Sequence, residues 1–358
     1  MLVEDGFRSQ GSGMNKTAKI IRFRQPGPPE VLKVEEEFVR EPKAGEVLLR
    51  VDALGLSRID LLWREGSYFE QPVCPAGIGY DAAGVIESVG PEVRTVKPGD
   101  RVSTFPAVSL QDYPAHGEAV IYPENALFLY PQNLNPREAV SVNTGLFAAY
   151  FAFVELAGLQ PDQFVVITAA SSSMGLAAIQ LVKALGARCI ALTRSEGKRK
   201  RLIQAGADHV AVAGVDDVNE MILEITKGEG ADLIYDGVAG PGLEELVWAT
   251  RRFGRVIVYG HLGAMDATTP LPLGACFLRG FNLHPSFKIF DFTGNPKLGI
   301  RPNPAAIERA KTFVAAGLAS GLLKPAIDRV FTGLDEYAAA HRYMSANTQA
   351  GKIVVALR

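Results

Sequence analysis

A turn of small residues, Ala169 to Gly175, lies between two apolar segments of different pattern. The segment before it, 164–167, is short and rich in β-branched residues, as in a strand that is buried on both faces of a sheet. The segment after it has helical spacing and ends near Gly186. Unpaired N–H groups and the positive end of the helix dipole meet at such a strand-to-helix turn, so it is suited to bind an anion such as a dinucleotide pyrophosphate.

Glycines usually form this turn, because the backbone must come close to the phosphate. Here serines take most of the positions, and one glycine remains where the helix must pack closely on the strand. Serine hydroxyls can donate to phosphate in place of backbone N–H groups. The pattern alone also fits a turn that binds nothing. The residues expected to hold the pyrophosphate are Ser171, Ser172, Ser173, Met174 and Gly175.

Cations follow the next strand, about 20 residues further on. An acidic residue there would bind the ribose hydroxyls of NAD, whereas cations accommodate the 2′-phosphate of NADP. Thr193, Arg194 and Lys198 provide a hydroxyl, a guanidinium and an ammonium, which suit a phosphomonoester. The cofactor predicted from these residues is NADPH. The next three cations, Arg199 to Arg201, are interpreted as a solvated helix face.

The whole sequence indicates a soluble globular protein of two domains. Its 358 residues exceed one ordinary core, and its net charge of −2 argues against a dedicated nucleic-acid or membrane surface. Three widely spaced cysteines form no CxxC pair, which favours a reducing compartment, and we expect a cytoplasmic protein. No long uninterrupted apolar run or signal peptide is recognised. Residues 1–13 are interpreted as a disordered extension or linker before a natural start at Met14.

The elements that must position these groups change character along the chain. Short segments broken by Gly and Pro predict a mainly antiparallel first domain, with strands at 18–23, 46–56, 80–90, 100–105 and 117–123. A helix is expected at 135–158. Alternating strands and helices then predict a doubly wound parallel α/β sheet of six strands, which include 164–167, 189–192, 209–214, 233–236 and 255–260. After a helix at 305–319, residues 324–358 return to strand, helix and strand, and we expect them to rejoin the first domain.

Motifs along nearly the whole chain from Ala18 resemble the medium-chain dehydrogenase/reductase superfamily, in its zinc-free quinone oxidoreductase and enoyl reductase branch. They include GPPEVLKVEE, GYDAAGVIESVGPEVRTVKPGDRV, AGLQPDQFVVITAASSSMGLAAIQLVKALGA and the terminal GKIVVAL. The resemblance implies a GroES-like β-rich catalytic domain at 14–140, completed by 325–358, and a Rossmann NADPH-binding domain at 141–324. It also implies an active cleft between the domains and a homodimer joined through the Rossmann sheets.

Zinc alcohol dehydrogenases of the same superfamily hold a catalytic zinc on Cys, His and Cys. By the resemblance, these three positions fall on Ser57, Tyr80 and Thr144, and the acid that follows the histidine becomes Asp81. None of the three replacements is a competent zinc ligand, and the four-cysteine structural lobe is missing. No metal site is therefore expected. Without a metal to polarise it, the hydride acceptor must already be electron-poor, as quinones and conjugated enones are.

Two side chains are candidates for the chemistry itself. In the enoyl reductases, a tyrosine of a Gly-x-Tyr element protonates the substrate or holds its oxygen, and Tyr68 matches it in Gly66-Ser67-Tyr68. Tyr68 can equally be a wall of the pocket. Ser57 lies where relatives often have Asn near the nicotinamide. It either orients substrate or water, or it is a small residue at a strand end.

Other candidates carry weaker expectations. Gly260 and His261 follow a strand at its carboxyl end, where ligands bind in open α/β sheets, so they could line the nicotinamide pocket. His261 and His116 are more often packing residues than catalysts. Asp60 is interpreted as structural. The aromatic segment 287–292 is either a substrate wall or core.

The function predicted from the sequence is an NADPH-dependent, zinc-independent oxidoreductase that transfers hydride to a quinone or an α,β-unsaturated carbonyl. Two alternatives stay open. One is an alcohol dehydrogenase-type enzyme that acts on an alcohol or ketone. The other is a non-catalytic NADPH-binding sensor or crystallin-like protein. The expected partners are a small electrophilic substrate and a second copy of the chain, with neither nucleic acid nor membrane.

Overall fold

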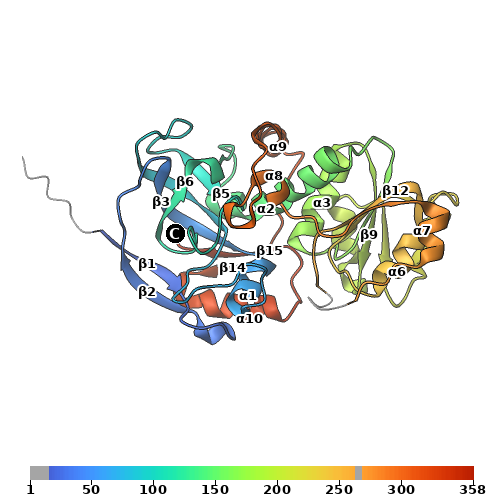
Figure 1. Cartoon of the computed structure of the whole chain (residues 1–358), viewed down its shortest axis with the longest axis horizontal. Coiled ribbons are helices and arrows are strands. Elements are labelled where there is room, and N and C mark those ends of the chain that lie inside the picture. Colours follow the sequence, from blue (N-terminus) through green and yellow to red (C-terminus); the bar gives the residue numbers. More distant parts are fainter. Residues whose placement is uncertain (1–15, 263–267) are drawn as a thin grey trace, which may run out of the picture.

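The computed structural model describes residues 16–262 and 268–358, and these form two lobes that lie side by side (Figure 1). The predicted extension at 1–13 lies outside the described residues. One lobe is built on an antiparallel sheet and the other on a parallel sheet. The predicted α/β class, a β-rich domain followed by a doubly wound domain, is confirmed.

The first lobe contains a sheet in the order β14-β15-β3-β4-β5-β7, with β6 also paired to β3. A separate antiparallel pair, β1 and β2, lies beside it. Two strands were not predicted, because β2 is highly charged (KVEEEF) and β7 has only three residues. The strands are β1 (Thr17–Arg22), β2 (Lys33–Phe38), β3 (Glu46–Leu56), β4 (Asp81–Val89), β5 (Arg101–Thr104), β6 (Ala119–Pro123), β7 (Leu127–Leu129), β14 (Ile327–Thr332) and β15 (Lys352–Ala356).

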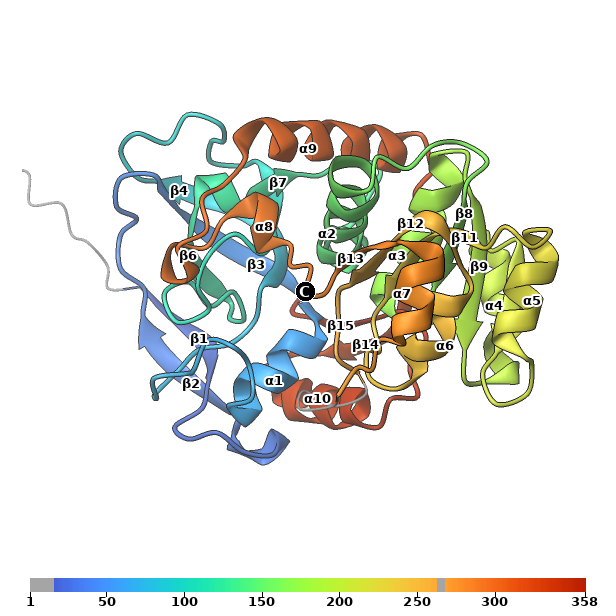
Figure 2. The same ribbon diagram turned by 45° about the vertical axis from the view of Figure 1, so that its right-hand side comes forward.

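The end of the chain enters this first sheet. β15 pairs antiparallel with β3, so that Val354 lies opposite Gly55, and β14 runs parallel to β15. Helix α10 (Tyr337–Ser345) connects the two strands, and it packs near α1 (Arg58–Glu65). The first lobe is therefore assembled from both ends of the sequence, and its central strand β3 is held by neighbours from each (Figure 2).

The second lobe is a six-stranded sheet in the order β10-β9-β8-β11-β12-β13, and every pair in it is parallel. This order reverses between β8 and β11, the kind of switch point where ligands bind in doubly wound sheets. The strands are β8 (Phe164–Ile167), β9 (Arg188–Thr193), β10 (His209–Val212), β11 (Ala231–Asp236), β12 (Thr250–Val258) and β13 (Asn282–His284). The helices are α3 (Ser173–Ala184), α4 (Arg199–Gln204), α5 (Val218–Ile225), α6 (Gly242–Trp248) and α7 (Leu273–Arg279).

Helix α2 (Pro136–Tyr150) lies between the two lobes (Figure 2). Asn135 caps it by accepting a hydrogen bond from the N–H of Glu138, and a π-helical segment continues it to Leu156. The whole segment is long and apolar enough to cross a membrane, a property that the sequence pattern did not reveal. However, 72% of its most apolar window is buried inside the protein, as in the core helix of a globular protein.

The segment after β13 returns to the first lobe. Helices α8 (Phe290–Thr293) and α9 (Pro304–Ala319) contact each other, and α9 also contacts α2. Thr293 donates a hydrogen bond to the carbonyl of Pro106 over 2.6 Å, and Phe290 packs edge-on against Tyr80. The aromatic segment 287–292 is thus mostly core, and its Phe290 lies against the first lobe. Short 3₁₀ helices lie at Pro29–Val31, Glu124–Ala126, Glu196–Lys198, Pro296–Leu298 and Leu334–Glu336.

Candidate active site

The small-residue turn has the local geometry of a nucleotide-binding turn. Ser172 caps α3, and its hydroxyl accepts a hydrogen bond from the N–H of Gly175 over 3.0 Å. Ala169 adopts a positive φ of 46°, a conformation that glycine usually supplies. A Cβ on Gly175 would lie 2.5 Å from the carbonyl oxygen of Ala170, so only glycine fits there. The close approach predicted for Gly175 is therefore present.

The loop after β11 closes the other side of this turn. Thr168 donates to the carboxylate of Asp236 over 2.5 Å, and that carboxylate also accepts the N–H of Ala239 over 2.8 Å. Behind the loop, the rings of Tyr235 and Tyr259 stack with centroids 4.0 Å apart. These contacts hold the carboxyl ends of β8 and β11 in fixed positions at the switch point of the sheet.

Tyr259 provides a test of whether a ligand fits here. Its hydroxyl is buried and has no hydrogen-bond partner among the described residues. A Cβ on Gly237 would lie 2.6 Å from that hydroxyl, so the glycine keeps the space beside it open. This phenol lies between two glycine-rich strand ends, with the Ser172 side chain near it, and it can bond a polar ligand there. The residues at this edge fit a dinucleotide.

The predicted phosphate-binding cations lie beyond the end of β9. Thr193 is buried, and its hydroxyl accepts the N–H of Ser195 over 3.2 Å. Arg194 is exposed, whereas Lys198 is half-buried and donates to the carbonyl of Gln349 over 2.9 Å. Burial lowers the pKa of Lys198. Arg199 instead pairs with Glu196 over 2.7 Å, which agrees with its interpretation as a helix-surface residue.

Two predicted cofactor residues, Gly260 and His261, directly follow β12 and its neighbour Tyr259. A Cβ on Gly260 would lie 2.8 Å from the carbonyl oxygen of Gly237, so this glycine also lets two strand ends approach. His261 is exposed. It lies close in the sequence to residues 263–267, which are outside the described residues. The structure therefore places both residues at the carboxyl end of β12 and assigns no contact to His261.

Tyr68 lies in an aromatic group at the end of α1. Gly66 ends that helix in the left-handed conformation, with φ of 70°, and Tyr68 follows as a buried side chain. Its ring packs against Phe69 with centroids 3.9 Å apart, and it also meets the edge of Trp63. Burial raises the pKa of Tyr68 far above its usual range, although the nearby phenol of Tyr80 opposes the rise. Tyr68 is therefore a neutral hydrogen-bond donor at any ordinary pH.

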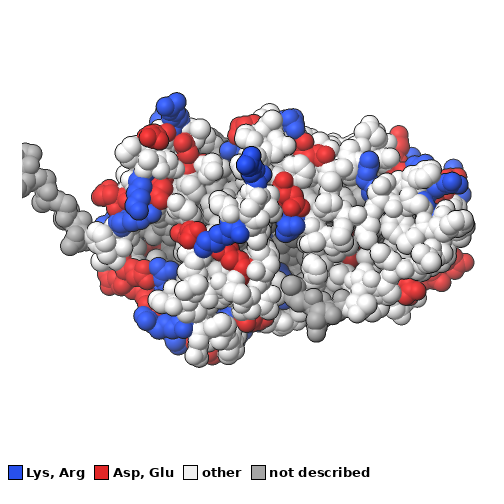
Figure 3. All heavy atoms as spheres, viewed as in Figure 1, with Lys and Arg blue, Asp and Glu red and all other residues white. Residues whose placement is uncertain are grey.

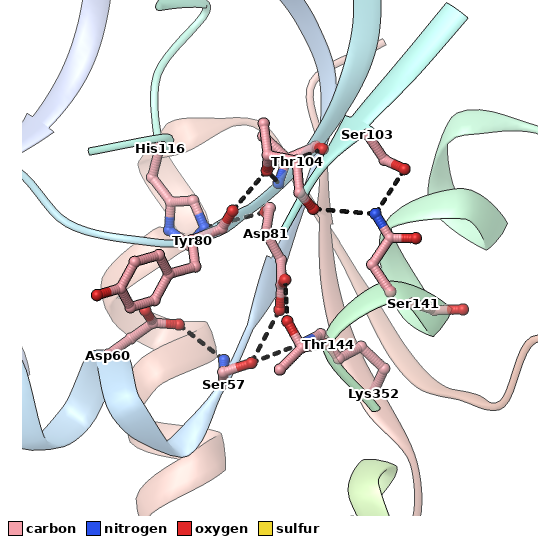
Figure 4. Close-up of polar contacts among 12 residues, drawn as sticks. Ser57, Asp60, Tyr80, Asp81, Ser103, Thr104, His116, Ser141, Thr144 and Lys352 are labelled. Carbon is pink, nitrogen blue, oxygen red and sulfur yellow. Dashed lines mark hydrogen bonds and ion pairs between the residues drawn. The ribbon is translucent and has the colours of Figure 1, made fainter. Parts of the chain in front are cut away.

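A polar cluster includes two of the three positions matched to the zinc ligands, Ser57 and Thr144 (Figure 4). Lys352, the first residue of β15, donates to Asp81 Oδ2 over 2.5 Å and to Ser57 Oγ over 2.7 Å. Ser57 in turn lies 2.9 Å from the same carboxylate oxygen, and Thr144 donates to the other one. We call Ser57, Asp81, Thr144 and Lys352 the lysine cluster. Its members come from the start of α1, β4, α2 and β15, so the fold of the first lobe assembles it.

The lysine cluster is buried in a prepared space. Lys352 and Asp81 are 3% and 1% exposed. A Cβ on Gly55 would lie 2.8 Å from Lys352 Cε, so this glycine in β3 makes room for the lysine stem. Tyr80, next to Asp81, is buried and its hydroxyl has no partner among the described residues. A cation is therefore built into the cluster that contains Ser57 and Thr144.

Two further predictions concern neighbours of the cluster. Asp60 accepts the N–H of Ser57 over 2.7 Å at the start of α1, which agrees with its structural interpretation. His116 is buried. Its Nδ1 lies 2.5 Å from the hydroxyl of Tyr337, and its Nε2 lies 3.1 Å from the backbone carbonyl of Asp81. It supports the backbone of the cluster through the carbonyl of Asp81. Both residues act as supports.

Sequence reasoning missed Lys352 and did not give Asp81 a role. Each had a signal. Lys352 is the only charged residue in the strand KIVVA, and Asp81 begins the equally apolar DAAGV. Burying a single charged side chain in an apolar strand costs free energy, unless it pairs with an opposite charge. A lysine in one buried strand and an aspartate in another are therefore expected to form a pair. Tyr259 was missed for another reason: a tyrosine at the end of an apolar strand has no sequence mark that separates a ligand contact from packing.

Comparison with known proteins identifies the family. A model of the alcohol dehydrogenase GroES-like domain matches residues 43–155, and a model described as zinc-binding dehydrogenase matches residues 173–292. Human quinone oxidoreductase is 30% identical over 256 residues, which cover 70% of this chain and 75% of that protein. The chain belongs to the medium-chain dehydrogenase/reductase superfamily, in its quinone oxidoreductase branch.

Solved structures of this branch share the whole fold. The quinone oxidoreductase of Pseudomonas syringae pv. tomato DC3000 superimposes with a TM-score of 0.82 at 26% identity, over 95% of this chain and all of the other. The Escherichia coli quinone oxidoreductase complexed with NADPH gives a TM-score of 0.81 at 24% identity, again over 95% and 100%. The present member of the branch carries the lysine cluster at two of the three matched metal positions. In residues 16–262 and 268–358, no group of three or more His, Cys, Asp or Glu is arranged to hold a metal ion.

Proposed function

We propose that this protein is an NADPH-dependent, zinc-independent reductase that transfers hydride to a quinone or to an α,β-unsaturated carbonyl. The observation that supports it best is the contact between the two lobes at the site. The backbone of Ser172, in the small-residue turn, bridges to Gly351, and the next residue is Lys352. The expected nucleotide turn and the lysine cluster therefore lie against each other, as a hydride donor and the residues around its acceptor must.

NADPH would be held along the carboxyl edge of the parallel sheet. In this assignment the turn residues 171–175 bind the pyrophosphate, and Thr193, Arg194 and Lys198 bind the 2′-phosphate. Gly260 and His261 lie toward the nicotinamide end, where the unpaired hydroxyl of Tyr259 is also available. When bound, the nicotinamide supplies a hydride. The Escherichia coli quinone oxidoreductase was solved as a complex with NADPH, which agrees with this choice of cofactor.

The acceptor is proposed to lie between Tyr68 and Ser57. These two side chains flank Tyr80: its phenol influences the pKa of Tyr68, and its neighbour Asp81 bonds Ser57. A neutral phenol and a hydroxyl can both donate to a carbonyl oxygen. Of the positions matched to zinc ligands, Ser57 bonds the ammonium of Lys352, Thr144 bonds the carboxylate of Asp81, and Tyr80 is a phenol. A divalent cation would have to displace the charge of Lys352, which is why zinc independence is proposed.

The reaction can be tested with purified protein by following NADPH absorbance. Quinones and enones form one panel, and alcohols with NADP form a second, each with and without a strong chelator. The proposal expects turnover in the first panel that a chelator leaves unchanged. Chelator-sensitive alcohol oxidation would establish the alcohol dehydrogenase alternative instead. Tight NADPH binding with no turnover in either panel would establish a non-catalytic binding protein.

We further propose a homodimer that forms through the second lobe. β13 is an edge strand of the parallel sheet, and the adjacent α7 exposes Leu273, Phe277 and Leu278, which are 84%, 87% and 60% exposed. Figure 3 shows few charged side chains on this part of the lobe, whereas both signs of charge are mixed over the first lobe. An exposed apolar patch beside an open strand edge is typical of a protein interface.

The three cysteines are free, which suits a reducing compartment such as the cytoplasm.

A further inference from the structure

Two residues that are next to members of the lysine cluster in the sequence lie against the expected cofactor site. The first contact is the backbone bridge between Ser172 and Gly351, which precedes Lys352. The second is in α2: a Cβ on Gly145, which follows Thr144, would lie 3.3 Å from the carbonyl of Ser173. Two members of the cluster are therefore each one residue away from contact with the turn. The cluster therefore lies close in the fold to the turn that is expected to bind the cofactor.

The hydrogen bonds of the cluster leave one donor unused. An ammonium has three N–H groups, and Lys352 uses one on Asp81 and one on Ser57. Asp81 accepts from Lys352 and Thr144, one on each carboxylate oxygen, so both oxygens stay bonded even if Ser57 turns its hydrogen elsewhere. Ser57 is the half-buried member, and Asp81, Thr144 and Lys352 are buried. The hydroxyl of Ser57 is thus the group through which the cluster can bond a ligand.

Stability alone is a poor explanation for this arrangement. A buried ion pair often stabilises a protein no more than apolar residues of similar volume would. The glycine in the central strand leaves room for two neighbours, because a Cβ on Gly55 would lie 2.8 Å from Lys352 Cε and 2.9 Å from the carbonyl oxygen of Val140. The fold therefore keeps a desolvated cation in a low-dielectric place, where its effect on a nearby oxyanion is larger than in water.

We propose that Lys352 supplies the proton of the reduction and passes it through the hydroxyl of Ser57 to the substrate oxygen. This inference rests on the proposed function. As hydride reaches the acceptor, negative charge develops on its carbonyl oxygen. The proton of the Ser57 hydroxyl moves to that oxygen as the O–H bond breaks. A proton of the Lys352 ammonium moves to Ser57 Oγ as its N–H bond breaks. Lys352 is left as a neutral amine beside the Asp81 carboxylate, and it regains a proton from solvent.

The products balance. A quinone that gains one hydride and one proton becomes a hydroquinone, and an enone becomes an enol, which then tautomerises to the ketone. Ser57 begins and ends as a hydroxyl, so it is the catalytic residue, and Lys352 is the positioning residue that acts through it. Tyr68 has a different part in this scheme. Its raised pKa suits it to hold the substrate oxygen as a neutral donor.

The kinetic test compares variants that separate charge from proton supply. Lys352→Arg keeps a cation beside Asp81 but cannot release a proton at ordinary pH. Ser57→Ala removes the relay, and Ser57→Thr keeps a hydroxyl. With a quinone acceptor, we expect kcat to fall about 100-fold in Lys352→Arg and in Ser57→Ala. The NADPH affinity of both variants should stay within about twofold of wild type. Ser57→Thr should remain largely active. Wild-type kcat in Lys352→Arg would overturn the proposal.

A solvent isotope measurement reports the two moving protons directly. We expect the wild-type rate, plotted against the deuterium fraction of the solvent, to lie below the straight line that joins the values in H2O and D2O, because two protons move with the hydride. A strictly linear or absent dependence would contradict the relay. Lys183→Met is the matched control, since Lys183 is a surface residue that pairs with Asp208 over 2.8 Å and should leave both rate and curvature unchanged.

Binding of 4-nitrophenol provides a readout that needs no turnover. The probe resembles the anion formed after hydride transfer, and its absorbance distinguishes phenolate from phenol. Wild-type protein should bind it as phenolate. The double variant Lys352→Met with Asp81→Asn removes both charges, so no buried charge is left unpaired and the protein can fold. This variant should bind the probe as phenol, and phenolate binding equal to wild type would refute the role of Lys352.

The two proposals can fail separately. If none of the acceptors in the panel supports NADPH oxidation by the wild-type protein, the proposed function fails. If the double variant then also binds phenolate as well as the wild-type protein does, the oxyanion site is rejected too. If wild-type protein turns over quinone or enone while Lys352→Arg matches its kcat, the proposed function stands and the relay is wrong. Lost turnover in Lys352→Arg together with lost phenolate binding in the double variant supports both.

Discussion

Lys198 donates a hydrogen bond from Nζ to the backbone carbonyl of Gln349, 2.9 Å away. Lys198 follows the second strand of the parallel sheet, whereas Gln349 lies just before β15 of the first lobe. Together with the bridge between Ser172 and Gly351, this bond ties the expected cofactor site to the chain that carries Lys352. The residue predicted to select NADPH is therefore also a contact between the lobes.

Arg194 and Lys198 should differ in what their loss does. Arg194→Ala should weaken NADPH about tenfold or more and leave NADH unchanged, because a guanidinium–phosphate hydrogen bond is charge-assisted. Lys198→Ala should do the same and also lower kcat, because it removes the bond to Gln349. Fluorescence titration with both cofactors measures the affinities. Lys200→Ala, an exposed neighbour, is the control. Equal losses for NADPH and NADH would refute the 2′-phosphate assignment.

Much of the fold could be predicted because its strands are strongly patterned. The apolar run 164–167, the turn after it and the periodic helix to Gly186 mark one strand-turn-helix unit, and β8 and α3 appear there. The charged strand β2 and the short strands β7 and β13 could not be predicted, because pairing with a neighbour, rather than their own composition, holds them in place.

The candidate site was only partly predictable, for a physical reason. Local rules apply to Gly175, whose need for close packing follows from the turn that contains it. The pair of Lys352 and Asp81 joins strands that are 271 residues apart, and nothing local to either residue specifies that contact. The resemblance to the zinc enzymes indicated which ligands are missing. It could not indicate that a lysine ammonium bonds Ser57, one of these positions.

Tyr68→Phe should lower kcat/KM for an enone about tenfold and leave NADPH affinity unchanged. The change removes one hydrogen bond to the substrate oxygen while the ring keeps its packing against Phe69. Because burial raises the pKa of Tyr68, we expect no ionisation of this residue in the rate profile between about pH 6 and 9. Steady-state kinetics and cofactor titration test this. An unchanged kcat/KM would reduce Tyr68 to a wall of the pocket.

Gly175→Ala should destabilise the second lobe and weaken NADPH binding. The added Cβ would lie 2.5 to 2.6 Å from backbone atoms of Ala170, so the turn must shift. We expect a loss of about 1–3 kcal/mol in the free energy of unfolding, as for other overpacked sites. Denaturant unfolding with and without NADPH measures both effects. Gly197→Ala is the matched control, because its Cβ would meet nothing closer than 3.8 Å.

Phe277→Glu should convert the proposed dimer to a monomer. Phe277 is 87% exposed on α7, beside the edge strand β13, and a carboxylate there would be buried and unpaired in the interface. Light scattering after gel filtration gives the mass of each form. Val215→Glu is the control, because Val215 is 75% exposed but follows β10 at the opposite edge of the sheet. A monomeric wild-type protein, or a dimeric Phe277→Glu variant, would refute this interface.

The stability of the first lobe should depend on pH through three buried groups around the lysine cluster. Burial lowers the pKa of His116 to about 4, and burial with the adjacent Arg64 lowers that of His341 well below its usual value. Burial raises the pKa of Asp60 to about 7. Both histidines are therefore neutral in the folded protein and gain protons on unfolding below about pH 6.5. Asp60 does the opposite, because it is protonated when folded and ionises on unfolding above about pH 4.

Between about pH 4.5 and 6, unfolding thus takes up two protons at the histidines and releases one at Asp60. The unfolded state binds one more proton, so the free energy of unfolding should rise with pH by about 1.4 kcal/mol per unit. Asp60→Asn keeps an oxygen to accept the N–H of Ser57 but removes the opposing group, so its slope should be about twice as steep. Urea unfolding across this range measures both slopes. If the free energy of unfolding of the wild-type protein is flat or falls with pH, the histidines are not held neutral in the folded protein. If the slope of Asp60→Asn equals that of the wild-type protein, Asp60 is ionised in the folded protein.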